Sequence, residues 1–355
     1  MSCHCGLPTA LDDYFHSIYF PRSAFPLKSA LCHCNSCRHV SGQLFVTFAV
    51  IPAAKPGEDV LSGDHDGDGP GKMGLTRYAS SGTMTRWFCG RCGASVVNVE
   101  EGEWEVATGC LSFEDGPGLR HGLEGSLQRA QIWVDDVSAD GGAAAWVNGG
   151  KAEGMKRYLK GRGGEEVCDE TVERMVEEGR RRTHAVETQR KNKDVVERGK
   201  ELQAFCHCRS VRFTIARPRD ESKKYQACLD ACTSCRTVSG FEITSWVTVP
   251  QSSISLPDGG KLDLSKMAGL RKYKTSENVS RYFCKTCGAT VFYLKDQLDT
   301  IDVGVGLLDA EEGAIAESWL EWDEYPACVA YPDDAVDQEF VTKLAEGIRD
   351  GRHQG

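Results

Sequence analysis

The chain has 355 residues, of which 40% are hydrophobic and 26% are charged, so it has enough material for two globular domains. Its formal net charge is −10 and its lysines and arginines form no block, which argues against nucleic acid or an anionic membrane as the main partner. The N-terminal region shows neither the ~20 apolar residues of a membrane span nor the basic segment that opens a signal peptide. We therefore expect a cytoplasmic protein.

In the first half, residues 44–52 are rich in aromatic and β-branched residues and end at a proline, which predicts a strand. Residues 56–74 are rich in glycine and aspartate and predict a surface loop. These two segments indicate a β-rich domain with at least one long connection.

Two further predicted strands, residues 85–89 and 94–100, flank a Cys-x-x-Cys turn formed by Cys89 and Cys92. Gly93 follows the second cysteine, where a left-handed backbone conformation is often required. We expect a hairpin whose turn presents two sulfur atoms to one metal ion.

A segment dense in glutamate, arginine and lysine, residues 165–203, follows a glycine-rich stretch. Val172, Met175 and Val176 have helical spacing within it, so we predict a solvated helical connector, N-capped by Asp169. Its mixed charges are typical of a solvated face rather than of a binding surface.

The second half repeats the first half, and the repeated segments keep their order. Three blocks align, with the cysteines in register, and a period this long indicates two globular copies rather than a solenoid. The aligned blocks are residues 3–6 with 206–209, 34–52 with 232–250, and 74–99 with 269–294. We predict a first domain at 1–160, a linker at 161–202, a second domain at 203–340 and a tail at 341–355.

The chain has 17 cysteines, and an odd number without a visible signal peptide argues against a disulfide framework. Most of them form short clusters, as soft metal ions require. The first-half clusters are Cys3 and Cys5, Cys32 with Cys34 and Cys37, and Cys89 with Cys92. We expect the cysteines outside the clusters to be small buried hydrophobic residues; these are Cys110, Cys168 and Cys328.

The seven clustered cysteines of the first half divide into a set of four and a set of three. A closed structural zinc site needs four ligands, and these are available in Cys3, Cys5, Cys89 and Cys92. Residues two apart on a strand point to the same face, so the histidines between the cysteines would point away from the metal. We expect His4 and His33 to be packing or surface residues.

The remaining trio, Cys32, Cys34 and Cys37, leaves one position of a tetrahedral ion open, which is typical of a reactive zinc. Such a centre can hold an incoming thiol as a thiolate, and a thiolate can attack, or be released from, an electrophilic carbon. Two alternatives remain: the trio takes a fourth ligand from elsewhere, or all seven cysteines serve folding.

The motifs "CHCG" (3–6), "CHCNSCRHVSG" (32–42) and "FCGRCG" (88–93) resemble those of the glutathione-dependent formaldehyde-activating enzyme family, also called the CENP-V/GFA domain. The resemblance implies a mainly β architecture: two tandem Mss4-like zinc-binding β domains joined by the charged helical linker. It implies a structural zinc on four cysteines and a second zinc on the catalytic trio, with one or two zinc ions in the second domain. It also implies carbon–sulfur lyase activity, in which glutathione is the co-substrate and formaldehyde or a related aldehyde-type electrophile is its partner.

The second copy keeps the structural set but departs from the reactive one. The matching structural residues are Cys206, Cys208, Cys284 and Cys287. Cys232 and Cys235 align with two members of the trio, whereas Asp230 takes the place of the third. Either Asp230 supplies an oxygen ligand, or a β-bulge lets Cys228 complete a three-cysteine site.

Several residues near these motifs are weaker candidates. Arg38 follows the trio and is our candidate for binding a glutathione carboxylate, although a structural role is as well supported, and the same holds for Arg236. As strand residues, Arg86 and Arg281 should contact solvent or a local carboxylate. We expect the aromatic residues of the same strands to be core residues; these are Trp87, Phe88, Tyr282 and Phe283.

The leading hypothesis is therefore a zinc-dependent enzyme of the S-hydroxymethylglutathione synthase type. The alternative is a non-catalytic zinc-binding interaction or scaffold module, which the altered trio of the second copy favours. A nucleic-acid binder is disfavoured by the acidic balance.

Overall fold

The computed structural model describes residues 3–5, 22–51, 75–111, 113–114, 120–121, 123, 125–147, 155–191, 201–220, 222–324 and 326–353. The loop predicted at residues 56–74 lies outside the described residues. None of the described helices is long and apolar enough to cross a membrane.

The first half is built on one eight-stranded sheet with the order β10-β9-β1-β2-β6-β5-β4-β3. Its strands pair antiparallel except for β9, which lies parallel to both β1 and β10. The strands predicted from composition are confirmed as β2, β4 and β5. The bounds are β1 (Leu27–Cys32), β2 (Val46–Val50), β3 (Leu75–Ala79), β4 (Met84–Cys89), β5 (Ser95–Glu100), β6 (Glu103–Ala107), β9 (Leu127–Ile132) and β10 (Lys156–Arg157).

The second half repeats this sheet in the order β16-β17-β18-β19-β14-β13-β21, with β22 also paired to β13. Its strands are β13 (Tyr225–Asp230), β14 (Thr244–Pro250), β16 (Leu270–Ser276), β17 (Val279–Cys284), β18 (Thr290–Lys295), β19 (Thr300–Gly304), β21 (Leu320–Trp322) and β22 (Val329–Ala330). A separate four-stranded sheet contains β11 (Glu201–Phe205), β12 (Arg212–Ala216), β15 (Ile254–Ser255) and β20 (Leu308–Asp309). The protein is thus mainly β, in two sheet-based halves.

Short elements connect these strands. They are η2 (Arg22–Ala24), η3 (Thr108–Cys110), β7 (Phe113–Glu114), β8 (Arg120–His121), η4 (Val134–Val137), α4 (Ala144–Val147), η6 (Gln251–Ser253), η7 (Val305–Leu307) and η8 (Pro332–Asp334).

One short helix follows the first strand of each sheet: α2 (Asn35–Ser41) and α6 (Thr233–Ser239). Each begins at a cysteine whose sulfur accepts a hydrogen bond from a backbone N–H of the first turn. Each ends at a glycine with a positive φ, 76° at Gly42 and 87° at Gly240, which is the usual way to terminate a helix. The two halves therefore place a cysteine-capped helix at the same point of the fold.

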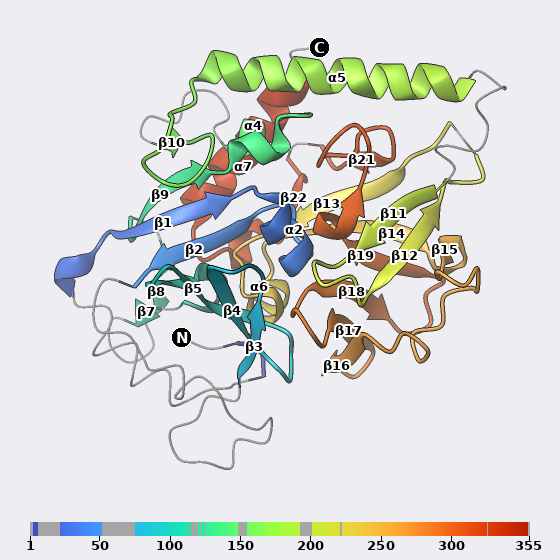
Figure 1. Cartoon of the computed structure of the whole chain (residues 1–355), viewed down its shortest axis with the longest axis horizontal. Helices are drawn as coiled ribbons and strands as arrows, with labels where there is room; N and C mark the ends of the chain where they lie inside the picture. The colour runs from blue at the N-terminus through green and yellow to red at the C-terminus, as the bar shows by residue number, and fades with distance from the viewer. Residues whose placement is uncertain are drawn as a thin grey trace.

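Two longer helices lie outside the sheets. The predicted connector is confirmed as α5 (Asp169–Lys191), which runs along one side of both halves (Figure 1). Val172 of α5 is buried, and Glu187 forms an ion pair of 3.1 Å with Lys224 of the second half. Helix α7 (Gln338–His353), which includes most of the predicted tail, was not foreseen; it buries Phe340, Val341, Leu344 and Ile348.

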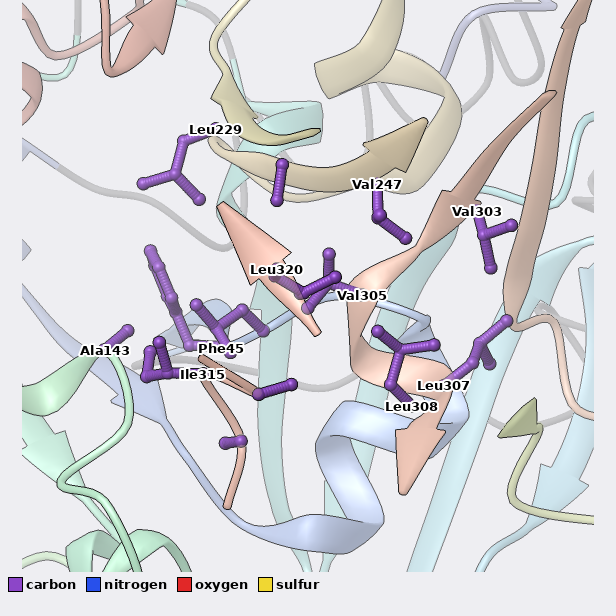
Figure 2. Packing of buried hydrophobic residues seen from close by; sticks show 14 of the residues in the cluster. Phe45, Ala143, Leu229, Val247, Val303, Val305, Leu307, Leu308, Ile315 and Leu320 are labelled. Atoms are coloured by element: carbon purple, nitrogen blue, oxygen red, sulfur yellow. The ribbon is translucent and has the colours of Figure 1, made fainter. Parts of the chain in front are cut away.

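The largest hydrophobic core crosses the boundary between the halves. In Figure 2, Phe45 and Ala143 of the first half lie near Ile315 of the second half, in a cluster that also contains Leu229 and Leu320. Trp146 and Trp322 pack edge to face across the same boundary with ring centroids 5.0 Å apart. The two halves consequently share one interior.

Reciprocal hydrogen bonds join the halves with approximate two-fold symmetry. The N–H of Gly306 donates to the Gly42 carbonyl at 3.0 Å, and the N–H of Gly109 donates to the Gly240 carbonyl at 2.9 Å. The N–H of His207 likewise donates to the carbonyl of His39, and that of His4 to the carbonyl of Thr237. This pattern is that of an isologous interface, here formed within one chain.

Candidate metal centres

The structure brings together four cysteines in each half. The ligand atoms of each group lie within 4.8 Å of one another; the groups are Cys3, Cys5, Cys89 and Cys92 in the first half and Cys206, Cys208, Cys284 and Cys287 in the second. In both groups the Cys-x-Cys pair lies in a turn rather than on the strand that the sequence suggested, and the Cys-x-x-Cys pair lies at the end of a hairpin strand. Gly93 closes the first hairpin turn with a φ of 87°, as expected, and Gly288 closes the second with a φ of 81°.

The sulfur spacing fits a tetrahedral zinc ion. Cys5 Sγ lies 3.4 Å from Cys3 Sγ and 3.6 Å from Cys89 Sγ, and the 3.5 Å from Cys208 Sγ to Cys206 Sγ is similar. A zinc tetrahedron with bonds of ~2.3 Å has edges of about 3.8 Å, whereas a disulfide bond is about 2.05 Å long. Each half therefore carries a four-cysteine cluster consistent with a zinc site.

The intervening histidines are not ligands. His4 Nδ1 lies 3.0 Å from the hydroxyl of Tyr273, and His33 is fully buried with Nε2 3.0 Å from Gln131 Oε1. His207 Nδ1 lies 2.7 Å from the hydroxyl of Tyr78, so each histidine of a Cys-x-Cys turn contacts a tyrosine of the other half.

The structure also brings Cys32, Cys34 and Cys37 together, at the end of β1 and the start of α2. Cys34 caps the helix, because its Sγ accepts a hydrogen bond of 3.2 Å from the N–H of Cys37. The guanidinium of Arg86, on β4, donates to Cys37 Sγ at 3.4 Å. The pKa of Cys37 is lowered well below its usual value, first by hydrogen bonds from the Cys32 and Cys34 thiols and then by the charge of Arg86.

In the second half the equivalent group consists of Asp230, Cys232 and Cys235. The Asp230 carboxylate accepts a hydrogen bond of 2.8 Å from the N–H of Cys232, and Arg281 donates to Cys235 Sγ at 3.2 Å. Strand β13 pairs with β14 in an unbroken register over residues 227–230, so no β-bulge occurs at Cys228. Among the described residues, Cys228 does not belong to the group of Asp230, Cys232 and Cys235. Of the two alternatives raised by the sequence, the geometry favours the one with Asp230.

A cavity of about 200 Å³ opens beside the first-half trio. Its apolar wall includes Phe48, Met84 and Ile132, whereas its polar wall includes Arg86 and Glu105. The remaining lining residues are Ala30, Cys32, Cys34, Ser36, Cys37, Ser80, Ser81, Asn98, Glu100, Trp133 and Asp136. A small polar molecule can therefore reach the three sulfur atoms.

The corresponding region of the second half contains larger side chains. Trp246 aligns with Phe48, and Tyr293 aligns with Asn98. Their rings lie 6.2 Å apart, and the guanidinium of Arg281 lies 4.8 Å from the centroid of the Tyr293 ring. The second half therefore carries bulkier side chains at the positions equivalent to two cavity-lining residues of the first half.

The position of Arg38 does not suit a substrate ligand. It is buried, it is absent from the cavity lining, and it donates to Asn35 Oδ1 and to the carbonyl of Leu308 in the second half. Arg236 donates to the carbonyl of Gly109 in the first half in the same way. Both arginines hold the two halves together, because the helix that carries each of them faces the other half.

Two arginines reach the cysteines of these groups, and their contacts differ from the prediction. Arg86 and Arg281 were expected to meet solvent or a carboxylate, but both are buried against a cysteine sulfur. The presence of an arginine at the same position of both copies indicates a shared role, but the sequence repeat does not show which residue the arginine contacts. The four aromatic neighbours are buried, as predicted.

The cysteines outside the clusters follow the prediction in two cases. Cys110 and Cys328 are buried. Cys168 is exposed, because it directly precedes the solvated helix α5 rather than lying within a sheet.

The comparisons with known proteins agree with this architecture. A family model described as glutathione-dependent formaldehyde-activating enzyme matches residues 2–134 and matches again at residues 201–322. No curated protein matches the chain. The two family matches follow one another, as a tandem duplication requires, and together span more than half of the chain. The chain therefore belongs to the glutathione-dependent formaldehyde-activating enzyme family.

Proposed function

We propose that the chain is a zinc-dependent carbon–sulfur lyase that joins a small thiol to formaldehyde or a related small electrophile, and catalyses the reverse reaction. Glutathione is the thiol that the family name indicates. The observation that carries the proposal is that three cysteines able to hold one metal ion also line a cavity. We place this reaction in the domain at residues 1–160 and regard residues 203–340 as a domain with a degenerate site.

The donor set suits the metal. Three cysteine sulfurs within 4.8 Å of one another provide three corners of a zinc tetrahedron, and all three cysteines line the cavity. When bound, the zinc ion would supply a positive centre that keeps the substrate thiol deprotonated. The four-cysteine clusters would hold structural zinc, which gives two ions in the first domain and one or two in the second.

The residues of the chain contribute binding and orientation. Arg86 places a buried positive charge against Cys37 and so offsets the negative charge of three thiolates. Phe48 and Ile132 give the cavity an apolar wall beside the sulfur atoms. Together these features favour chemistry at sulfur.

Metal content and activity test the proposal together. We expect the purified chain to hold about three or four zinc ions and to accelerate the formation of S-hydroxymethylglutathione from glutathione and formaldehyde, as measured by exchange NMR. Cys34→Ser should lose about one zinc ion and the activity while it keeps the circular dichroism spectrum of the wild type.

Cys168→Ser is the matched control, because Cys168 is exposed and outside the clusters, and it should retain both the zinc ions and the activity. The proposal fails if the wild type and Cys34→Ser are both indistinguishable from a reaction without protein.

A non-catalytic role is favoured for the second half alone. Arg281 donates to Cys235 of the Asp-Cys-Cys group, and its guanidinium lies 5.9 Å from the Trp246 ring and 4.8 Å from the Tyr293 ring. We propose that this half supports the fold of the first half. Asp230→Ala should then leave the lyase activity of the chain within about twofold of the wild type, and a larger loss would assign chemistry to the second half.

A further inference from the structure

Glu105 is a carboxylate in the cavity beside the trio. It lies on β6, opposite Asn98 of β5 on one side and Val50 of β2 on the other, and its side chain lines the cavity with Cys32, Cys34 and Cys37. It is not a member of the metal-binding groups found among the described residues. A molecule that reaches the sulfur atoms through this cavity therefore also meets Glu105.

The second half shows how a carboxylate at this position is otherwise used. Asp302 is the equivalent residue, since it lies opposite Thr248 as Glu105 lies opposite Val50. The hydroxyl of Thr248 donates to Asp302 Oδ1 at 2.6 Å. Val50 has no hydroxyl to donate, and glutamate is longer than aspartate by one methylene group, so the first half directs a longer carboxylate into an open cavity.

Burial, more than the surrounding charges, favours the protonated form of Glu105. Burial raises the pKa of Glu105 to about 7, and the negative charges of Cys37 on α2 and of Glu103 on β6 add to the effect. The guanidinium groups of Arg162 and of Arg86 on β4 oppose it. A carboxyl group with this pKa can both give and accept a proton near neutral pH.

The other carboxylates of the cavity are less suited to exchange a proton. Glu100 is exposed at the end of β5. The Asp136 carboxylate already accepts a hydrogen bond of 2.9 Å from the N–H of Asn35, so it is held at the start of α2.

We propose that Glu105 is the general acid and base of the lyase reaction; the inference rests on the function proposed above. In the forward direction the thiolate sulfur forms a bond to the carbonyl carbon, the π electrons move to the carbonyl oxygen, and the Glu105 carboxyl gives that oxygen its proton. In the reverse direction the Glu105 carboxylate removes the hydroxyl proton, the carbon–oxygen double bond re-forms, and the carbon–sulfur bond breaks to release the thiolate.

The pH profile of adduct breakdown tests the assignment. Breakdown needs the Glu105 carboxylate, so kcat/KM for S-hydroxymethylglutathione should rise with pH and level off above about pH 7. Glu105→Gln should lower the plateau at least about 100-fold and abolish the rise. Glu101→Gln, which changes an exposed carboxylate outside the cavity lining, should keep the rise and most of the rate.

An infrared titration provides a readout that does not depend on turnover. The wild type should show a carboxyl band that disappears near pH 7, and Glu105→Gln should lack that band. If the wild type is active and Glu105→Gln matches it in plateau and pH profile, or if the band persists in the variant, the assignment of Glu105 is wrong while the proposed function stands. If the wild type catalyses neither direction, both proposals are wrong.

Discussion

At the scale of single residues, the charge next to the sulfur trio is set by a strand rather than by the cysteine motif itself. Arg86 reaches Cys37 from β4, and the pKa of Arg86 is raised above its ordinary value: burial acts to lower it, but the nearby charges of Cys37 and Cys34 outweigh burial. Groups that contact metal ligands commonly tune metal affinity by about 10- to 100-fold.

We expect Arg86→Met to weaken zinc binding at the trio roughly tenfold or more, because it removes the positive charge that faces three thiolates. Competition with a chromophoric chelator measures the affinity. Arg77→Met is the control, since Arg77 is exposed on the neighbouring strand β3, and it should bind zinc like the wild type. Equal affinities for all three proteins would contradict the role of Arg86.

Asp140 gives a pH-dependent prediction for stability. Burial raises its pKa to about 6, although its carboxylate accepts hydrogen bonds from the N–H groups of Ile315 and Gly142. The pKa in the folded state lies above the unfolded value, so ionisation of Asp140 destabilises the fold as pH rises through about 4 to 6. The unfolding free energy of the wild type should therefore fall by about 2 kcal/mol relative to that of Asp140→Asn between about pH 4 and pH 8. Urea denaturation of both proteins at both pH values measures this change. The same free-energy difference between the two proteins at pH 4 and pH 8 would refute the prediction.

The cysteine groups could be predicted because sulfur chemistry depends on residue type and short spacing, both of which are visible in the sequence. The arginines could not be assigned, because their partners come from distant segments. Arg38 contacts Leu308 of the other half, and Arg86 contacts Cys37 across the sheet. The sequence around each arginine contains no pattern that predicts its contact partner.

At the scale of secondary-structure elements, the ends of α2 and α6 fix the contact between the halves. A methyl group added at Gly42 would overlap the carbonyl oxygen of Thr290, and one added at Gly240 would overlap that of Ser95. Both glycines also need a positive φ. The absence of a side chain at these glycines thus allows both the end of the helix and the close approach of the other half.

Gly42→Ala should therefore destabilise the whole protein by about 2 kcal/mol or more, since it combines backbone strain with a collision that only backbone movement can relieve. Gly82→Ala is the control, because a methyl group there meets no atom of the described residues within 4 Å. Differential scanning calorimetry compares the two variants; the same melting temperature for both would contradict this account.

The strands were predictable from aromatic and β-branched composition, and the connector from its apolar spacing. Helix α7 was not, because its buried face is defined by α4 and the shared core, which lie far away in the sequence. The parallel pairing of β9 with β1 could not be predicted either, because most of the first half separates the two strands in the sequence.

At the scale of the whole molecule, a buried ion cluster spans the two halves. Arg129 of β9 binds Glu242 through two hydrogen bonds of 3.0 and 2.8 Å and Asp337 through one of 2.6 Å. Its guanidinium also lies 4.4 Å from the ring centroid of Phe340. Removal of one partner from such a cluster leaves buried charges uncompensated.

Arg129→Met should lower the unfolding free energy by about 3–5 kcal/mol. Lys156→Met breaks an ion pair with Glu166 in which both side chains are more than half exposed, and it should change stability by at most about 1 kcal/mol. Guanidinium denaturation followed by tryptophan fluorescence tests both variants. Similar stability of the two would show that the cluster is not needed for the association of the halves.

The duplication could be predicted from the repeated blocks, but the interface between the copies could not. A repeat indicates that two similar domains exist, and it does not indicate which of their surfaces are in contact. Gln43 illustrates the point: its side-chain oxygen accepts from the N–H of Ser245 at 2.7 Å across the interface. Nothing in the sequence around Gln43 marks it as an interface residue.

The reciprocal contacts of this chain also have a consequence for how it can vary. In a homodimer, every substitution at a two-fold interface appears twice, and dilution separates the subunits. Here the covalent tether makes the pairing independent of protein concentration, and each copy can change alone. Leu44 and Glu242 occupy equivalent positions, yet only Glu242 faces an arginine, and Asp230 stands where the other copy keeps a cysteine. Joining the copies therefore lets the cysteine group of one copy change while that of the other copy is kept.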